Sequence, residues 1–92
     1  MQIEAIEIGP VRASADQRAL SARIVFRFHD KAGRPAAAHF LGKTERAEDD
    51  TASKVAERLV WDAYRQLVRM PEFRSGREEV SFADAVSLGA AA

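Results

Sequence analysis

The chain of 92 residues contains no cysteine, and this absence removes several kinds of chemistry at once. It excludes disulfides, thiolate nucleophiles and zinc sites built on cysteine. A reducing compartment fits such a composition, so we expect a cytoplasmic protein. The first ten residues, MQIEAIEIGP, also lack the basic start and the long apolar stretch of a secretory signal peptide.

Long apolar runs and an excess of one charge are missing as well. No stretch approaches the roughly 18 consecutive apolar residues of a membrane span, so we expect no membrane partner. Basic and acidic residues number 14 each, so no net field attracts nucleic acid or an anionic membrane. The length suits one domain over residues 1–92, in which residues 89–92 form a frayed tail.

Motifs for catalysis and for cofactors are not found in the sequence. It has no Gly-rich phosphate loop, no serine nucleophile elbow and no Cys–His pair. We therefore expect no cofactor and favour a non-catalytic protein over an enzyme. His29, His39 and Asp30 could be imagined as a metal site, but solvated residues of a sheet account for them better, and we expect no metal.

What the sequence does contain is one long amphipathic stretch, residues 50–70. Its interior has no Gly or Pro and is rich in good helix formers. Asp49, Asp50 and Thr51 are candidate N-caps, and Pro71 ends the helix. At about 100° per residue, one narrow apolar stripe runs along this helix, flanked by Val55 and Val60. Its members are Ala52, Ala56, Leu59, Ala63, Leu67 and Met70.

A second apolar stripe lies on the opposite side of this helix. It contains Trp61, Tyr64 and Val68, which include the only Trp and the only Tyr of the chain. A helix lying on a sheet needs one apolar stripe, so something should cover the second. One candidate cover is the chain's own C-terminal segment. The other is the same helix of a second copy, because a two-fold interface is self-complementary.

We favour the second copy and predict a homodimer. Glu57 and Arg65 flank the second stripe and could pair across the interface. The predicted interface residues are Glu57, Trp61, Tyr64, Arg65 and Val68.

Three segments before the helix predict strands. The first is residues 2–8, in which the alternation sets Ile6 and Ile8 on one side and Ile3 and Ala5 on the other. The second is residues 20–29, the clearest alternation in the chain, and the third is residues 36–41. A turn that contains Gly33 joins the last two as a hairpin.

The hairpin has one favoured register, which sets large residues against small ones. It places Ala36 opposite Phe28, Ala38 opposite Phe26, Phe40 opposite Ile24, and His39 opposite Val25. The predicted core unites the strand and helix stripes. It consists of Ile24, Phe26, Phe28, Phe40, Leu59, Ala63 and Leu67.

The predicted fold class is therefore α+β, with a three-stranded antiparallel meander packed on one long helix and a short C-terminal element. Val80, Phe82, Val86 and Leu88 alternate as a fourth strand would. Ser81 could instead cap a short helix, and the pattern favours the helix slightly.

The outward face of the hairpin is basic and suggests an alternative function. Arg23, Arg27, His29 and His39 all point away from the predicted core. Such a face could bind nucleic acid or another anion, although it has no aromatic residue apart from the histidines on which bases could stack. We favour an interaction module that self-associates through the back of the long helix.

Overall fold

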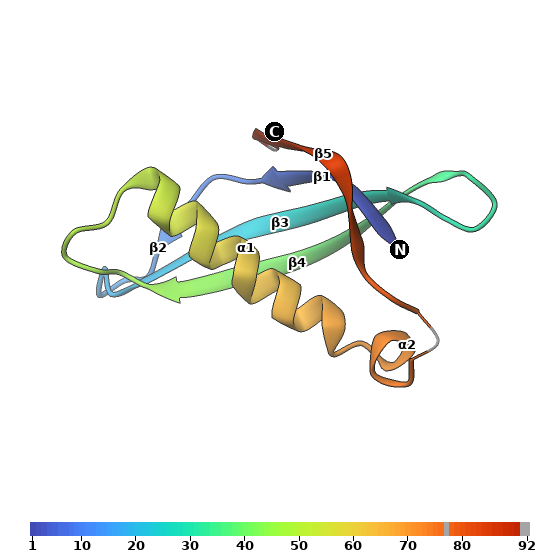
Figure 1. The fold of residues 1–92 in the computed structure, drawn as a ribbon. Coiled ribbons are helices and arrows are strands. Elements are labelled where there is room, and N and C mark those ends of the chain that lie inside the picture. The colour runs from blue at the N-terminus through green and yellow to red at the C-terminus, as the bar shows by residue number, and fades with distance from the viewer. Residues whose placement is uncertain (77, 91–92) are drawn as a thin grey trace.

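The computed structural model describes residues 1–76 and 78–90 and has an α+β architecture (Figure 1). One mixed sheet of five strands is covered on one face by one main helix. The elements are β1 (Gln2–Ile8), β2 (Arg12–Ala13), β3 (Ala19–His29), β4 (Pro35–Glu45), α1 (Ala52–Val68), α2 (Pro71–Arg74) and β5 (Ser81–Ala90). No helix in the described part of the chain is long and apolar enough to span a membrane.

The sheet is larger than predicted and is not purely antiparallel. Strand β3 lies between β4 on one side and β1 and β2 on the other, and all three pair with it in antiparallel fashion. Strand β5 pairs with the other edge of β1 and runs parallel to it. The prediction of a three-stranded antiparallel meander was therefore wrong in strand count and in type of sheet.

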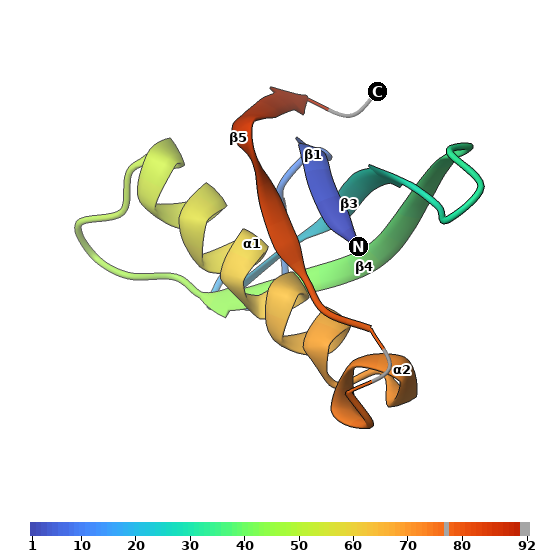
Figure 2. The same ribbon diagram turned by 45° about the vertical axis from the view of Figure 1, so that its right-hand side comes forward.

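The C-terminal element is a strand, so the slight preference for a helix was also wrong. Its start lies beside the N-terminus, where the Ser81 amide donates to the Met1 carbonyl over 2.9 Å. In Figure 2 this strand runs between α1 and β1. The edge of β1 provides hydrogen-bond partners that a local pattern cannot reveal. Residues 89 and 90 of the predicted frayed tail belong to β5, and residues 91 and 92 lie outside the described residues.

The predicted hairpin register is confirmed at every pair. Ala36 lies opposite Phe28, Ala38 opposite Phe26, and Phe40 opposite Ile24. Gly33 adopts a φ of 77°, the left-handed conformation that favours glycine in this turn. The strands extend beyond the predicted hairpin, because pairing continues as far as Ala19 and Glu45.

Strand β1 departs from the predicted alternation. Ile3 and Ile6 are both buried, although strict alternation would place them on opposite faces. The register of β1 against β5 shifts between Ile3 and Ala5, which pair with Phe82 and Ser87. Four residues of β5, 83–86, thus lie opposite the single residue Glu4 of β1.

Helix α1 begins and ends close to the predicted positions. The Thr51 hydroxyl accepts a hydrogen bond from the Lys54 amide, so Thr51 is the N-cap among the three candidates. The chain leaves the helix after Val68, and Pro71 opens the short α2. The buried face is centred slightly differently from the predicted stripe: Ala52 is exposed, and the buried residues are Val55, Leu59, Ala63 and Leu67.

The core lies between α1 and the sheet, as predicted. Five of the seven predicted core residues are buried, namely Ile24, Phe26, Leu59, Ala63 and Leu67. Phe28 and Phe40 are only partly buried. Gly42 allows α1 to approach β4 very closely, because a Cβ at that position would lie 2.5 Å from the Leu59 carbonyl oxygen.

Candidate interaction site

A cluster of three aromatic side chains lies on the back of α1. The rings of Trp61 and Tyr64 meet edge to face, with centroids 5.6 Å apart. Phe82 of β5 lies beside Tyr64 at 5.9 Å. Edge-to-face and tilted contacts at these distances are favourable for aromatic pairs. Strand β5 thus supplies an aromatic neighbour to the second apolar stripe of the helix.

This cover is incomplete. Tyr64 and Val68 are half-buried, and together with Val80 they line one shallow hollow. Trp61 remains 53% exposed and Phe82 48% exposed. The chain's own C-terminal segment therefore covers part of the stripe, and two large apolar side chains stay in contact with solvent.

Charged residues flank Trp61 symmetrically along the helix. Glu57 lies four residues before Trp61 and Arg65 four residues after it, and both are exposed. The Arg65 guanidinium also contacts Asp62 at 3.3 Å. We call the exposed set Glu57, Trp61, Arg65 and Phe82 the Trp61 surface.

The predicted basic face is partly neutralised by carboxylates of β1. Arg27 donates from Nε to both carboxylate oxygens of Glu7, at 2.8 and 2.7 Å, and this hydrogen bonding lowers the pKa of Glu7. His29 Nδ1 lies 2.7 Å from a carboxylate oxygen of Glu4. Arg23 and His39 are exposed on the same face. The positive charge available to an anion is therefore smaller than the sequence suggests.

The histidines do not share a site. His39 lies opposite Val25 as predicted, while His29 lies opposite Pro35 at the end of the hairpin. Among residues 1–76 and 78–90, no group of three His, Asp or Glu side chains is arranged to hold a metal ion.

One half of the outer edge of β4, residues 41–45, is covered by side chains of α1. The Lys43 amide donates to Asp62 over 2.9 Å, and Gln66 Nε2 donates to the Leu41 carbonyl over 2.8 Å. Arg58 donates to the Glu45 carbonyl over 3.1 Å. These bonds satisfy backbone groups that an edge strand would otherwise offer to another chain.

Two carboxyl groups, those of Asp62 in α1 and of Asp50 just before it, have lowered pKa values. Burial opposes ionisation of Asp62, but hydrogen bonds from the Lys43 amide, Arg65 and Gln66 outweigh it and lower its pKa. Asp50 accepts two hydrogen bonds of 2.7 Å from Arg58 and one from the Ala47 amide, which lowers its pKa to about 2. Both carboxylates are therefore ionised throughout the neutral range.

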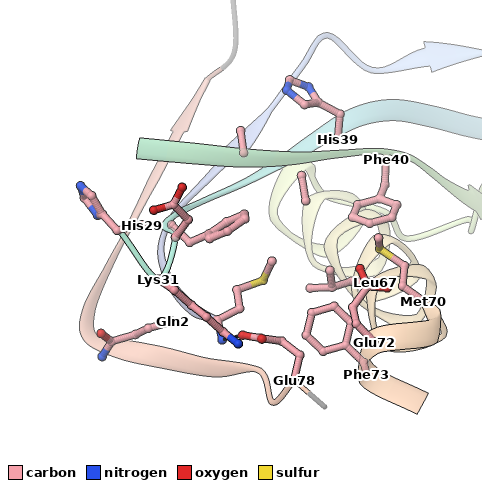
Figure 3. A pocket seen from close by; sticks show the side chains of 15 residues that line it. Gln2, His29, Lys31, His39, Phe40, Leu67, Met70, Glu72, Phe73 and Glu78 are labelled. Atoms are coloured by element: carbon pink, nitrogen blue, oxygen red, sulfur yellow. Dashed lines mark hydrogen bonds and ion pairs between the residues drawn. The ribbon is translucent and has the colours of Figure 1, made fainter. Parts of the chain in front are cut away.

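A cavity of about 560 Å³ lies beyond the end of α1, beneath the hairpin end of the sheet. Its apolar wall is formed by side chains from β3, β4, α1 and α2, which converge in Figure 3. They include Phe28, Phe40, Leu67, Met70 and Phe73. Lys31 and Glu78 lie at its polar rim, where Glu78 pairs with the N-terminal amine.

Comparison with protein-family models, with curated proteins and with solved structures found no match to this chain. Its function must therefore be inferred from its own surfaces.

Sequence reasoning missed the cavity and the partners of the charged residues. The spacing of Asp62 and Gln66 indicates a pair, and they do interact at 3.2 Å, but their contacts with β4 depend on tertiary packing. Only a weak signal indicated the partners of Arg27 and His29. Glu4 and Glu7 lie in a predicted strand, and carboxylates of one strand can pair with basic residues of a neighbouring strand.

Proposed function

We propose that this protein is a non-catalytic interaction module that self-associates through the Trp61 surface. The observation that supports this most strongly is the exposure of Trp61, which is 53% accessible although it lies beside Tyr64 in an aromatic cluster. Exposed Trp and Phe side chains are typical of interaction sites, because they bury large apolar areas on binding. The cytoplasmic location expected from the composition stays a prediction.

The charges around Trp61 favour a second copy of the chain as the partner. In an antiparallel pair of α1 helices with Trp61 at the two-fold axis, Glu57 of each copy lies opposite Arg65 of the other. The two charged residues are eight positions apart, roughly 12 Å along the helix. The same patch is then complementary to itself, as a two-fold interface requires.

We expect this association to be weak. Trp61 and Phe82 together can contribute only part of the roughly 1,200–2,000 Å² that stable interfaces bury. The dimer should therefore dissociate on dilution into the micromolar range or below.

Light scattering across a dilution series tests the proposal. We expect a mass that falls toward one chain on dilution, accompanied by a red shift of Trp61 emission. Trp61→Glu should give a folded monomer at all concentrations. Arg23→Glu is the matched control, because it adds an acidic residue on the opposite face of the sheet and should leave the dimer intact.

A charge exchange sharpens the test. Glu57→Arg and Arg65→Glu should each weaken dimerisation, and the double variant should restore it, because opposite charges again face each other across the axis. A wild-type protein that stays monomeric at all concentrations would overturn the proposal.

The basic outer face supports a second function less well. Arg27 and His29 form ion pairs with carboxylates of β1, so only Arg23 and His39 of the four predicted residues form no ion pair within the described chain. Salt-sensitive binding of RNA that is abolished by Arg23→Ala with Arg27→Ala would favour this alternative.

A further inference from the structure

The two halves of the outer edge of β4 differ in what covers them. Within the described residues, β4 pairs with β3 alone, so its other edge faces away from the sheet. The bonds from Lys43, Leu41 and Glu45 to α1 identify the odd-numbered residues as those whose backbone groups point outward. The register with β3 is continuous along the whole strand, so this orientation persists at His39 and Ala37.

Residues 35–39 form the open half of this edge. In the described part of the chain, no hydrogen bond reaches the outward N–H and C=O groups of Ala37 and His39. Helix α1 ends at Val68, so no further residue of α1 extends along this half. Ala37 and His39 therefore present alternating donors and acceptors at the spacing of a β-strand.

The apolar cavity lies directly beside the open half. Ala37, Ala38 and His39 are among its lining residues, and Phe40 and Phe73 contribute aromatic walls, as Figure 3 shows. Its volume of about 560 Å³ falls in the range of sites that bind small molecules and side chains. A strand added to this edge would direct every second side chain toward the cavity.

We propose that this groove binds an extended peptide segment of another protein. The peptide adds to β4 as a further strand at Ala37–His39 and places apolar side chains in the cavity. A backbone partner is favoured over a small apolar molecule because the mouth of the cavity carries unpaired peptide groups in strand geometry. This mode combines backbone bonds for affinity with a pocket for specificity, and it does not depend on the Trp61 surface.

Acetylated peptides of the form Thr-X-Thr-X-Thr-Lys amide are suitable probes, with both X residues Leu, Phe, Val or Ala. Binding is followed by amide NMR spectra of the ¹⁵N-labelled protein at up to about 1 mM peptide. We expect shifts centred on Ala37, His39 and Phe73. The Leu or Phe peptide should bind roughly tenfold or more tightly than the Ala peptide, because the larger side chains bury more apolar area.

Hydrogen exchange tests the backbone pairing. In the free protein, the Ala37 and His39 amides should exchange rapidly and the Lys43 amide slowly, because only Lys43 has an acceptor in Asp62. Saturating peptide should protect Ala37 and His39 at least about tenfold, since their amides then donate to the added strand.

Two variants of one residue form a matched pair. Ala37→Pro removes an outward donor and should abolish binding, whereas Ala37→Ser keeps the donor and should retain it. Arg23→Ala is a further control that should retain binding, because Arg23 is exposed and does not line the cavity. Circular dichroism establishes that each variant is folded.

Methylated peptides decide the question on the unaltered protein if Ala37→Pro does not fold. Every second amide of a β-strand points toward the neighbouring strand. One peptide is therefore N-methylated at the X residues and another at the Thr residues, and we expect only one of these two peptides to lose binding. Binding that survives both methylations would overturn the proposal. Failure of every probe to bind would also overturn it. So would protection of the Ala37 and His39 amides in the free protein that rises with protein concentration, because this would indicate that a second copy of the chain occupies the edge.

Discussion

The two halves of the β4 edge show how one strand can be protected at one end and open at the other. Along residues 41–45, polar side chains of α1 bond to the outward backbone groups, and Gly42 lets the helix lie against the strand. Along residues 35–39 the helix has ended, and a cavity takes its place. Whether an edge accepts a further strand thus depends on how far the neighbouring helix extends.

The largest effect should come from removing the side chain that anchors α1. Leu59 is fully buried in the core, so Leu59→Ala should lower the free energy of unfolding by about 2–5 kcal/mol. Urea denaturation measures this loss. A change below about 0.5 kcal/mol, the range of surface substitutions, would contradict the assigned core face of the helix.

The close approach of helix and strand can be broken at Gly42. A methyl group there would lie 2.5 Å from the Leu59 carbonyl oxygen, which belongs to the backbone and cannot rotate away. Gly42→Ala should therefore destabilise the protein by about 1–3 kcal/mol, the usual cost of overpacking. It should also speed exchange of the Lys43 amide. Gly89→Ala is the matched control, because a Cβ at that position meets open space. Gly33→Ala is unsuitable, because the positive φ of Gly33 would strain an alanine there.

A smaller loss of stability should follow from removing one hydrogen bond that covers the β4 edge, the bond accepted by Asp62. Asp62→Ala deletes the acceptor of the Lys43 amide and should cost about 0.5–1.5 kcal/mol, the net value of a typical hydrogen bond. Exchange of the Lys43 amide should then approach that of Ala37. Continued strong protection of Lys43 would show that another group seals this half.

Acid should loosen the start of α1 through Asp50. Its pKa is about 2 in the folded protein against a usual 3.8, so its ionised form contributes stability above pH 3.8 that is lost as the pH falls toward 2. Asp50→Asn should therefore show a shallower loss of stability over this interval than the wild type. Thermal unfolding at a series of pH values measures the difference, and equal slopes would contradict it.

The smallest effect should come from the outer face. Arg23 is exposed, so Arg23→Ala should change the free energy of unfolding by no more than about 0.5 kcal/mol. Arg27→Ala should destabilise the protein slightly more than Arg23→Ala, because it also removes the exposed ion pair with Glu7. A larger loss from Arg23→Ala would indicate that this face has a structural role.

Local patterns in the sequence determined the helix and the hairpin. The capping residue Thr51, the apolar repeat and Pro71 act within a few residues of one another, so α1 could be predicted from neighbours in the chain. The register of β3 and β4 was also predictable, because a short turn at Gly33 leaves few ways to match large residues with small ones. The aromatic stripe of Trp61 and Tyr64 followed from the same helical repeat.

Tertiary structure alone decided the rest, because those features depend on elements that meet from distant parts of the chain. Residues 81–90 form a strand because β1 offers them an edge, although their own pattern slightly favours a helix. Glu4 and Glu7 reach His29 and Arg27 only through the pairing of β1 with β3. The open edge at Ala37 and the cavity beside it exist because α1 ends before it reaches the tip of the hairpin. How far the helix extends along the strand depends on how the two elements pack, which the sequence pattern of neither element gives.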